Sequence, residues 1–266
     1  MNDLKLIKHC LIISYDGTHF YGYQRQVKNN VDKRTIQSEL EKALLRLYSI
    51  PISALSSGRT DAGVHARVQV VGFRLPHTHL DRYSLERLAL ALNAVLPLEI
   101  RVQKVLRMPD SFHVIKDVKK KTYIYFVNNG FSQKPWLRNY AWHLRLPIDW
   151  EKVRMAAKTL EGRHDFKSFC AANSSAKTTV RTIFEARCER VEIGQFLDCG
   201  PQMYAIRLTG SGFLKQMVRT IAGTLIQLGQ NKLTQAQFEA ILAANDRKKA
   251  GLTAPAHGLW LWDIQY

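Results

Sequence analysis

The order of hydrophobic and polar positions along the chain predicts strands and helices in two similar halves. In the first half, apolar residues recur with helical spacing after Thr35, a suitable N-cap, and again after Ser84. Apolar runs and alternation predict a first strand that ends near Ser14. They predict three further strands at residues 50–57, 66–74 and 99–106. The order strand, helix, strand, strand, helix, strand is the split β-α-β arrangement.

The second half shows a similar pattern with additional elements. Asp149 is expected to cap one helix, and Thr234 with Gln237 forms a capping box at the start of another. Periodicity predicts a third helix over residues 212–228, and strands are expected at 122–127, 179–192, 203–210 and 258–266. Pro109 and Asp110 predict a boundary, so that the halves are residues 1–108 and 109–266. Because no low-complexity linker separates the halves, we expect them to share one continuous sheet.

A loop between two of the predicted strands carries the strongest candidate for chemistry. Residues 58–65 read Gly-Arg-Thr-Asp-Ala-Gly-Val-His, so Asp61 has Arg59 two positions before it and His65 four positions after it. The glycines permit a tight backbone and the close approach of a ligand, and the flanking strands would hold the carboxylate in a fixed direction. The same residues are also typical of a salt-bridged turn, in which the aspartate caps and the arginine pairs.

The charge of the chain narrows the range of functions. Its 39 Lys and Arg residues against 22 Asp and Glu residues give a net charge of +17. A surplus of this size favours a polyanionic partner, and a basic protein without such a partner is the alternative. The basic residues are spread along the chain, which indicates a broad electrostatic surface instead of a disordered arm.

Other features of the composition favour a soluble cytoplasmic protein without a metal ion. The four cysteines are too few and too scattered for a disulfide framework, and their spacing is not that of zinc ligands. His77 and His79 form a pair of possible ligands, but the sequence offers no third ligand near them. The chain shows no signal-peptide pattern and no apolar run of about 18 residues, so we expect no membrane-spanning segment.

The loop at residues 58–65 resembles the signature motif of the bacterial tRNA pseudouridine synthase A family. Further motifs of that family are matched, in order, at residues 15–26, 121–125, 164–169, 181–183, 213–219 and 254–266. Matches in this order over nearly the whole chain are hard to explain by chance. One departure lies at Val114 and Ile115, where the family often has Ala-Arg, so no role of that arginine is carried over to this chain.

The resemblance implies an α+β fold of two ferredoxin-like, RRM-like halves that share a mixed, mostly antiparallel sheet with a central RNA-binding cleft. It implies an enzyme that isomerises uridine to pseudouridine at positions 38, 39 and 40 of the tRNA anticodon stem-loop, with no metal or other cofactor. It also implies a homodimer. Trp136, Trp142 and Trp150 lie in a stretch with little periodicity and are candidates for its interface, with a place on the back of the sheet as the alternative.

The resemblance also suggests roles for individual residues. Asp61 matches the catalytic aspartate of the family, whose carboxylate would add to a carbon atom or take a proton. Tyr123 matches the active-site tyrosine, which would stack on a uracil extruded from the RNA. Arg219 matches an arginine thought to pair with the acid, whereas Arg59 either pairs with Asp61 or points towards the RNA. His65 either contacts phosphate or braces the loop.

Two other functions are compatible with part of the sequence. A non-catalytic tRNA-binding module or RNA chaperone would use the same charge and aromatic residues, but binding alone has no need of an acid that faces phosphates. A glycoside hydrolase usually needs two carboxylates on either side of the scissile bond, and the loop offers Asp61 alone.

Overall fold

The computed structural model describes residues 6–28, 31–191 and 202–266. The chain forms two compact units, which are Met1–Lys119 together with Leu261–Tyr266, and Lys120–Trp260. The division at residues 108 and 109 stays a prediction. Cys199 and the last residue of the strand expected at 179–192 lie outside the described residues. None of the helices in the described ranges is long and apolar enough to cross a membrane.

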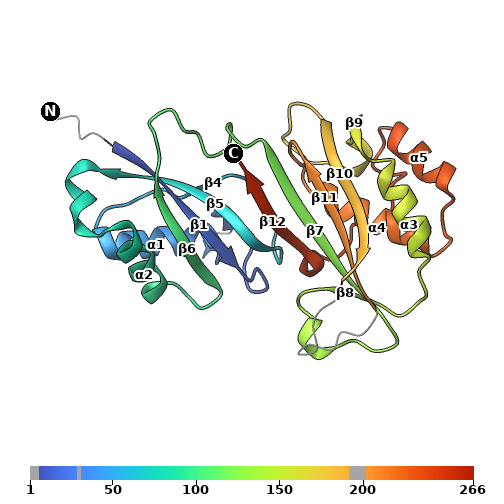
Figure 1. The fold of residues 1–266 in the computed structure, drawn as a ribbon, viewed down its shortest axis with the longest axis horizontal. Helices are drawn as coiled ribbons and strands as arrows, with labels where there is room; N and C mark the ends of the chain where they lie inside the picture. Colours follow the sequence, from blue (N-terminus) through green and yellow to red (C-terminus); the bar gives the residue numbers. More distant parts are fainter. Residues whose placement is uncertain (1–5, 29–30, 192–201) are drawn as a thin grey trace. The chain divides into compact units, whose positions relative to one another are not determined.

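The first unit contains the strand arrangement that its sequence predicts (Figure 1). Its main strands are β1 (Leu6–Tyr15), β4 (Leu55–Ser56), β5 (His65–Pro76) and β6 (Ile100–Arg107). β1 lies between β5 and β6 and is antiparallel to both, while β4 pairs with β5, also antiparallel. This order confirms the split β-α-β arrangement of the first half. A two-stranded ribbon, β2 (Val27–Lys28) with β3 (Val31–Asp32), is added to it.

The strand expected at residues 50–57 is shorter than the apolar run suggests. The strand that pairs with β5 consists of Leu55 and Ser56, and the Ser57 amide adds a hydrogen bond to the Val70 carbonyl at 2.8 Å. The backbone of Ala54 is satisfied by side chains instead: its N–H donates to Glu41 at 3.1 Å, and its carbonyl accepts from the Tyr23 hydroxyl at 3.0 Å. These side-chain bonds take the place of sheet hydrogen bonds at Ala54, and the strand begins at the next residue, Leu55.

Two capped helices complete the core of the first unit. Helix α1 (Ile36–Tyr48) is capped by Thr35, and helix α2 (Leu85–Val95) by Ser84, whose hydroxyl oxygen accepts from the Arg87 amide at 3.2 Å. The predicted starts of both helices are therefore confirmed. The buried core includes Leu88 and Leu92 of α2, an apolar stripe of α1 and one face of β1. The residues from α1 and β1 include Ile36, Leu40, Leu44, Ile7, Leu11 and Ile13.

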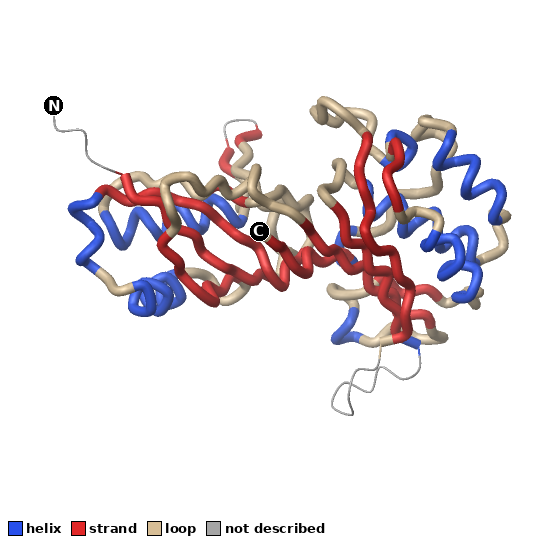
Figure 2. The backbone as a smooth tube through the Cα atoms, turned by 45° about the horizontal axis from the view of Figure 1, so that its top comes forward, coloured by secondary structure: helices blue, strands red, loops and turns tan. Residues whose placement is uncertain are grey.

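The second unit is a mostly antiparallel sheet with helices grouped on one side of it (Figures 1 and 2). Its strands are β7 (Lys120–Asn129), β8 (Trp142–Leu144), β9 (Gly162–Asp165), β10 (Val180–Arg190) and β11 (Met203–Gly210). The order is β7-β11-β10-β9, all antiparallel, with β8 parallel to β7. The last strand of the chain is β12 (Leu259–Gln265), whose residues from Leu261 onwards belong to the first unit. Within each unit, the predicted α+β class and the mostly antiparallel pairing are confirmed.

The helices of the second unit follow the sequence signals with one difference. They are α3 (Trp150–Lys158), α4 (Met217–Gly229) and α5 (Gln235–Ala243), and the caps Asp149 and Thr234 are confirmed, the latter as a capping box with Gln237. Helix α4 was expected from residue 212 but begins at Met217. Gln216 has a φ of 60°, a left-handed backbone that cannot belong to an α-helix, so the helix starts after it. Short 3₁₀ helices lie at His77–Arg82, Pro135–Leu137, Lys167–Phe169 and Ala256–Gly258.

Candidate active site

The loop that carries Asp61 joins β4 to β5 and is fixed at the residue before the acid. Thr60 is buried, and its Oγ1 lies 2.8 Å from the hydroxyl of Tyr15 at the end of β1. Burial raises the pKa of Tyr15 to about 12, so this hydroxyl keeps its proton over the physiological range. The Thr60 carbonyl accepts from the Tyr23 amide at 3.2 Å. Asp61 itself is half-buried at the surface of this frame.

A second set of hydrogen bonds ties the start of the loop to β5. Gln69 is fully buried in β5, and its side-chain oxygen accepts from the Ser57 hydroxyl at 2.6 Å. The amide nitrogen of the same side chain donates to the Gly58 carbonyl at 2.8 Å. Because a buried amide is costly to leave unpaired, these bonds restrain the first residues of the loop, Ser57 and Gly58. Neither Tyr15 nor Gln69 was identified as a site residue from the sequence.

Close backbone packing at Gly22 also holds the loop. Gly22 has a φ of +89°, and a Cβ atom at this position would lie 2.5 Å from the carbonyl oxygen of Thr60. A side chain here would require the backbone next to Asp61 to move.

We therefore expect Gly22→Ala to lower the free energy of unfolding by more than about 1 kcal/mol, because alanine disfavours a positive φ. We also expect it to slow turnover, because the carboxylate of Asp61 would be displaced. Chemical denaturation and single-turnover kinetics measure the two effects. A variant as stable and as active as the wild type would show that this contact does not position the loop.

His65 is the first residue of β5 and is completely buried. Its Nδ1 lies 3.1 Å from both the amide nitrogen of Gly17 and a carboxylate oxygen of Asp16. The same Asp16 oxygen accepts from the amide of Thr18 at 2.9 Å and from its hydroxyl at 2.6 Å. The sequence left two roles open for His65, and this position matches the bracing of the loop against the turn at residues 16–18.

Arg59 has the opposite environment from its neighbours. Its side chain is exposed, whereas Thr60 is buried. Within the part of the chain that the structure describes, the Arg59 guanidinium has neither an ion pair nor a hydrogen bond. A cation two positions before the acid in the sequence and open to solvent is available for an anionic ligand.

Tyr123 and Arg219 belong to the second unit. Tyr123, on β7, is buried, and its ring meets that of Phe213 edge to face at a centroid distance of 5.0 Å. Arg219, on α4, is half-buried, and its Nε donates to the Ala254 carbonyl at 2.8 Å. Asp61, Arg59 and His65 all belong to the first unit. The structure therefore places Arg59 and Asp61 on a loop and His65 at the start of β5 in the first unit. Tyr123 lies on a strand and Arg219 on a helix of the second unit.

Tyr125 lies on the same face of β7 as Tyr123 but has a different environment. It is completely buried, and its hydroxyl donates to the Pro255 carbonyl at 2.8 Å. Burial raises the pKa of Tyr125, and the positive charge of Arg219 partly opposes this rise. A buried tyrosine whose hydroxyl is bonded to a backbone carbonyl is typical of a structural residue.

Lys121 was not among the site residues predicted from the sequence. It lies two positions before Tyr123, so its side chain leaves the same face of β7. Burial lowers the pKa of Lys121 to about 8, so its charge falls as the pH rises above neutrality. The alternation along β7 could have drawn attention to it, but its burial is a property of the folded chain.

Comparison with known proteins gives a consistent result. A family model described as tRNA pseudouridine synthase matches residues 11–115 and 156–266, which include the Asp61 loop and Arg219 but not Tyr123. A protein from Bacillus pumilus named tRNA pseudouridine synthase A is 43% identical to this chain over 258 residues, which cover 96% of the chain and 97% of the relative. Proteins of the same name from Thermotoga neapolitana and Bacillus subtilis are 40% and 43% identical, over 96% of the chain and 98% and 97% of their own lengths.

Proposed function

The chain belongs to the tRNA pseudouridine synthase family, and we propose that it isomerises uridine to pseudouridine at positions 38, 39 and 40 of the tRNA anticodon stem-loop. In this reaction the bond between uracil N1 and ribose C1′ breaks, the base turns, and a new bond joins C5 to C1′. The proton of C5 is released and N1 gains one, so the reaction needs no oxidant or reductant. The observation that best supports the proposal is a half-buried carboxylate, Asp61, on a loop that is fixed by hydrogen bonds from Tyr15 and Gln69.

Asp61 is the proposed catalytic residue. A carboxylate suits this isomerisation because it can add to C1′ or take a proton from C2′, and can leave again. The bonds of Thr60 and Gln69 give the loop a fixed geometry, which reduces the reorganisation needed when the substrate arrives. Within the chain, these two braces are positioning residues and Asp61 carries the chemistry.

Tyr123 is the proposed platform for the reacting base. An enzyme that works on a base within a folded RNA must extrude that base, and an aromatic ring can receive it by stacking. The contact with Phe213 fixes the plane of the Tyr123 ring before the substrate binds. Arg219, whose positive charge reaches Tyr125, is proposed to contribute to the same active site.

Arg59 is proposed to contact the RNA backbone. If its guanidinium pairs with one phosphate, Arg59→Ala should weaken tRNA binding and reduce the slope of log affinity against log salt by about 1. Arg87→Ala is the matched control, because it removes an exposed arginine from α2 of the same unit. Fluorescence anisotropy at several salt concentrations measures both slopes. An unchanged slope for Arg59→Ala, or an equal change in the control, would rule out this contact.

The positions of the modified uridines can be mapped directly. Pseudouridine that has reacted with a carbodiimide stops reverse transcription, so primer extension on treated tRNA locates each isomerised site. We expect stops that correspond to positions 38, 39 and 40 only after incubation with the wild-type enzyme. Stops elsewhere in the tRNA would contradict the proposed positions, and an absence of any stop would favour a binding module without catalysis.

The chain is also proposed to act as a cytoplasmic homodimer. Among the three tryptophans considered for the interface, Trp150 is buried in a stack on Tyr204 at a centroid distance of 3.8 Å, and Trp142 meets Tyr125 edge to face at 6.2 Å. Trp136 is about half exposed, and the nearby Phe131 is 83% exposed. This exposed pair is the better candidate for contact with a second copy. Sedimentation equilibrium should give twice the chain mass of 30.5 kDa, and the mass of a single chain would contradict the dimer.

A further inference from the structure

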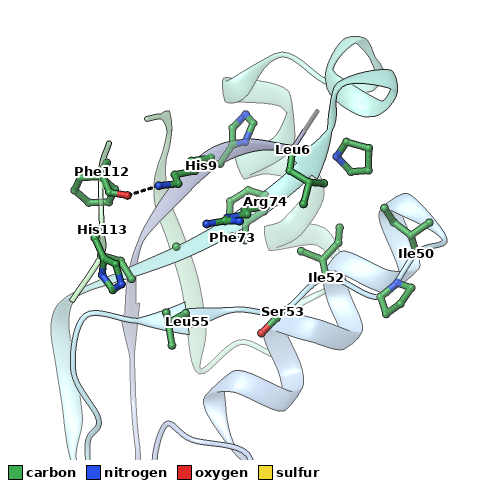
Figure 3. A pocket seen from close by; sticks show the side chains of 15 residues that line it. Leu6, His9, Ile50, Ile52, Ser53, Leu55, Phe73, Arg74, Phe112 and His113 are labelled. Carbon is green, nitrogen blue, oxygen red and sulfur yellow. Dashed lines mark hydrogen bonds between the residues drawn. The ribbon is translucent and has the colours of Figure 1, made fainter. Parts of the chain in front are cut away.

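The first unit has a pocket that is lined by residues outside the Asp61 loop. Its volume is about 470 Å³, within the range of pockets that hold small ligands. Figure 3 shows it between the start of β1, the end of β5, the segment before β4 and the segment after β6. Its walls are mainly apolar and include Leu6, Ile52, Leu55, Pro76, Phe112 and Val114. None of these residues belongs to the proposed catalytic machinery.

The register of the strands places two cations on the floor of this pocket. Lys8 on β1 is directly opposite Arg74 on β5, so both side chains leave the same face of the sheet. On the same face, Leu55 of β4 pairs with Gly72 of β5. A Cβ atom at Gly72 would lie 3.2 Å from the Cβ of Val114, so the segment after β6 packs closely over the strand.

Lys8 fixes the segment that forms one wall. Its ammonium group donates to the carbonyl of Asp110 and, at 2.9 Å, to the carbonyl of Phe112. An ammonium group has three N–H bonds, so one donor remains after these two contacts. The positive charge of Lys8 is therefore held in place at the pocket and is not neutralised by a carboxylate.

His113 presents a defined donor at the same wall. Its Nδ1 accepts from the backbone amides of Ile115 and Lys116 at 3.2 and 3.3 Å. A neutral imidazole whose Nδ1 accepts must carry its hydrogen on Nε2, which is then a donor. The neutral ring therefore offers one N–H donor, at Nε2.

The charges around the pocket select an anion. Arg74 is exposed, its guanidinium lies among the residues drawn in Figure 3, and it has no ion pair with any residue of the described ranges. Among the described residues that line the pocket, none is Asp or Glu. A guanidinium, an ammonium and an imidazole N–H in one place are the groups that commonly bind phosphate.

We propose that this pocket binds a nucleotide of the tRNA at a distance from the uridine that reacts. The phosphate would be held by Arg74, Lys8 and His113, and the base would lie against the apolar wall of Leu6, Ile52 and Leu55. Unstacked nucleotides of folded RNA are commonly bound in this way, by apolar or ring surfaces together with cations. The inference rests on the proposed function for the identity of the ligand, because a free mononucleotide has the same chemistry.

Two substitutions test the pocket in the full-length enzyme. Arg74→Ala removes one of the cations that would hold the phosphate. Leu55→Asp places a negative charge on the apolar wall. Both side chains are exposed enough for the fold to tolerate the change. The matched controls are Arg87→Ala and Leu90→Asp, since both residues are exposed on α2. We expect both pocket variants to raise the KM for tRNA about tenfold without changing kcat, and both controls to leave the KM unchanged.

A second measurement separates the two sources of the nucleotide. Binding of free uridine 5′-monophosphate is measured by isothermal titration calorimetry with the wild type and the same variants. If the pocket variants lose this binding while their KM for tRNA is unchanged, the pocket binds a free nucleotide and not a nucleotide of the tRNA. An unchanged KM and unchanged binding in both variants would overturn the proposal, as would an equal effect in the controls. If the wild type forms no pseudouridine, the proposed function fails, and the tRNA affinity of the variants still tests the pocket.

Discussion

Replacing Asp61 with asparagine should reduce the rate of pseudouridine formation at least about a thousandfold, in the range lost when a catalytic acid or base is removed. The amide has almost the same shape as the carboxylate, so the hydrogen bonds around Thr60 and Gln69 should be kept. It has no negative charge, and it can neither add to C1′ nor accept a proton from C2′. Single-turnover kinetics with saturating enzyme measure this loss without a contribution from tRNA binding.

The control for this substitution is Asp81→Asn, which changes an exposed aspartate of the same unit. The control should keep wild-type activity, and the affinity of the Asp61→Asn variant for tRNA should stay within a few-fold of the wild type. Activity within tenfold of the wild type in the Asp61→Asn variant would refute the assignment of Asp61 as the catalytic residue.

Replacing Tyr123 with alanine should have the second largest effect. A base that stacks on an aromatic ring gains roughly 1–3 kcal/mol, which corresponds to a loss of about 5- to 150-fold in kcat/KM. Tyr123→Phe separates the ring from the hydroxyl: it should be mildly impaired if the ring only stacks, and severely impaired if the hydroxyl takes part in proton transfer. In both cases alanine should be the worse variant.

Tyr125→Phe is the matched control for the tyrosine on β7. It removes the bond to the Pro255 carbonyl, and so should cost about 1 kcal/mol of the free energy of unfolding while turnover stays within a few-fold. Thermal unfolding and kcat/KM measure the two effects. Normal turnover by Tyr123→Ala, together with a large loss in Tyr125→Phe, would show that the wrong tyrosine of the strand had been chosen.

Much of the secondary structure follows from local sequence signals. The caps at Thr35, Ser84, Asp149 and Thr234 set the starts of four helices, because a capping bond spans only three residues. The late start of α4 could not be seen in the periodicity, since Leu214 is buried although it precedes the helix. There the left-handed backbone of Gln216 overrides the hydrophobic pattern.

The candidate site was predictable in part. A loop between two strands was expected to carry Asp61, and the structure has this loop between β4 and β5. The residues that brace it were not found, because Tyr15 and Thr60 are 45 positions apart and meet only in the folded chain. The choice of Tyr123 over Tyr125 depended on resemblance, since alternation gives both the same face. The arrangement of the two halves around a central cleft stays a prediction.

The central claim is that this chain catalyses the isomerisation of uridine in tRNA, and release of tritium tests it most directly. In tRNA made with uridine tritiated at C5, each isomerisation replaces the C5–tritium bond by the C5–C1′ bond, so one tritium enters the solvent. The wild-type enzyme should release tritium in proportion to the pseudouridine formed, and Asp61→Asn should release none above background. Tight binding of the tRNA by the wild type without release of tritium would contradict the account and identify the chain as a binding module.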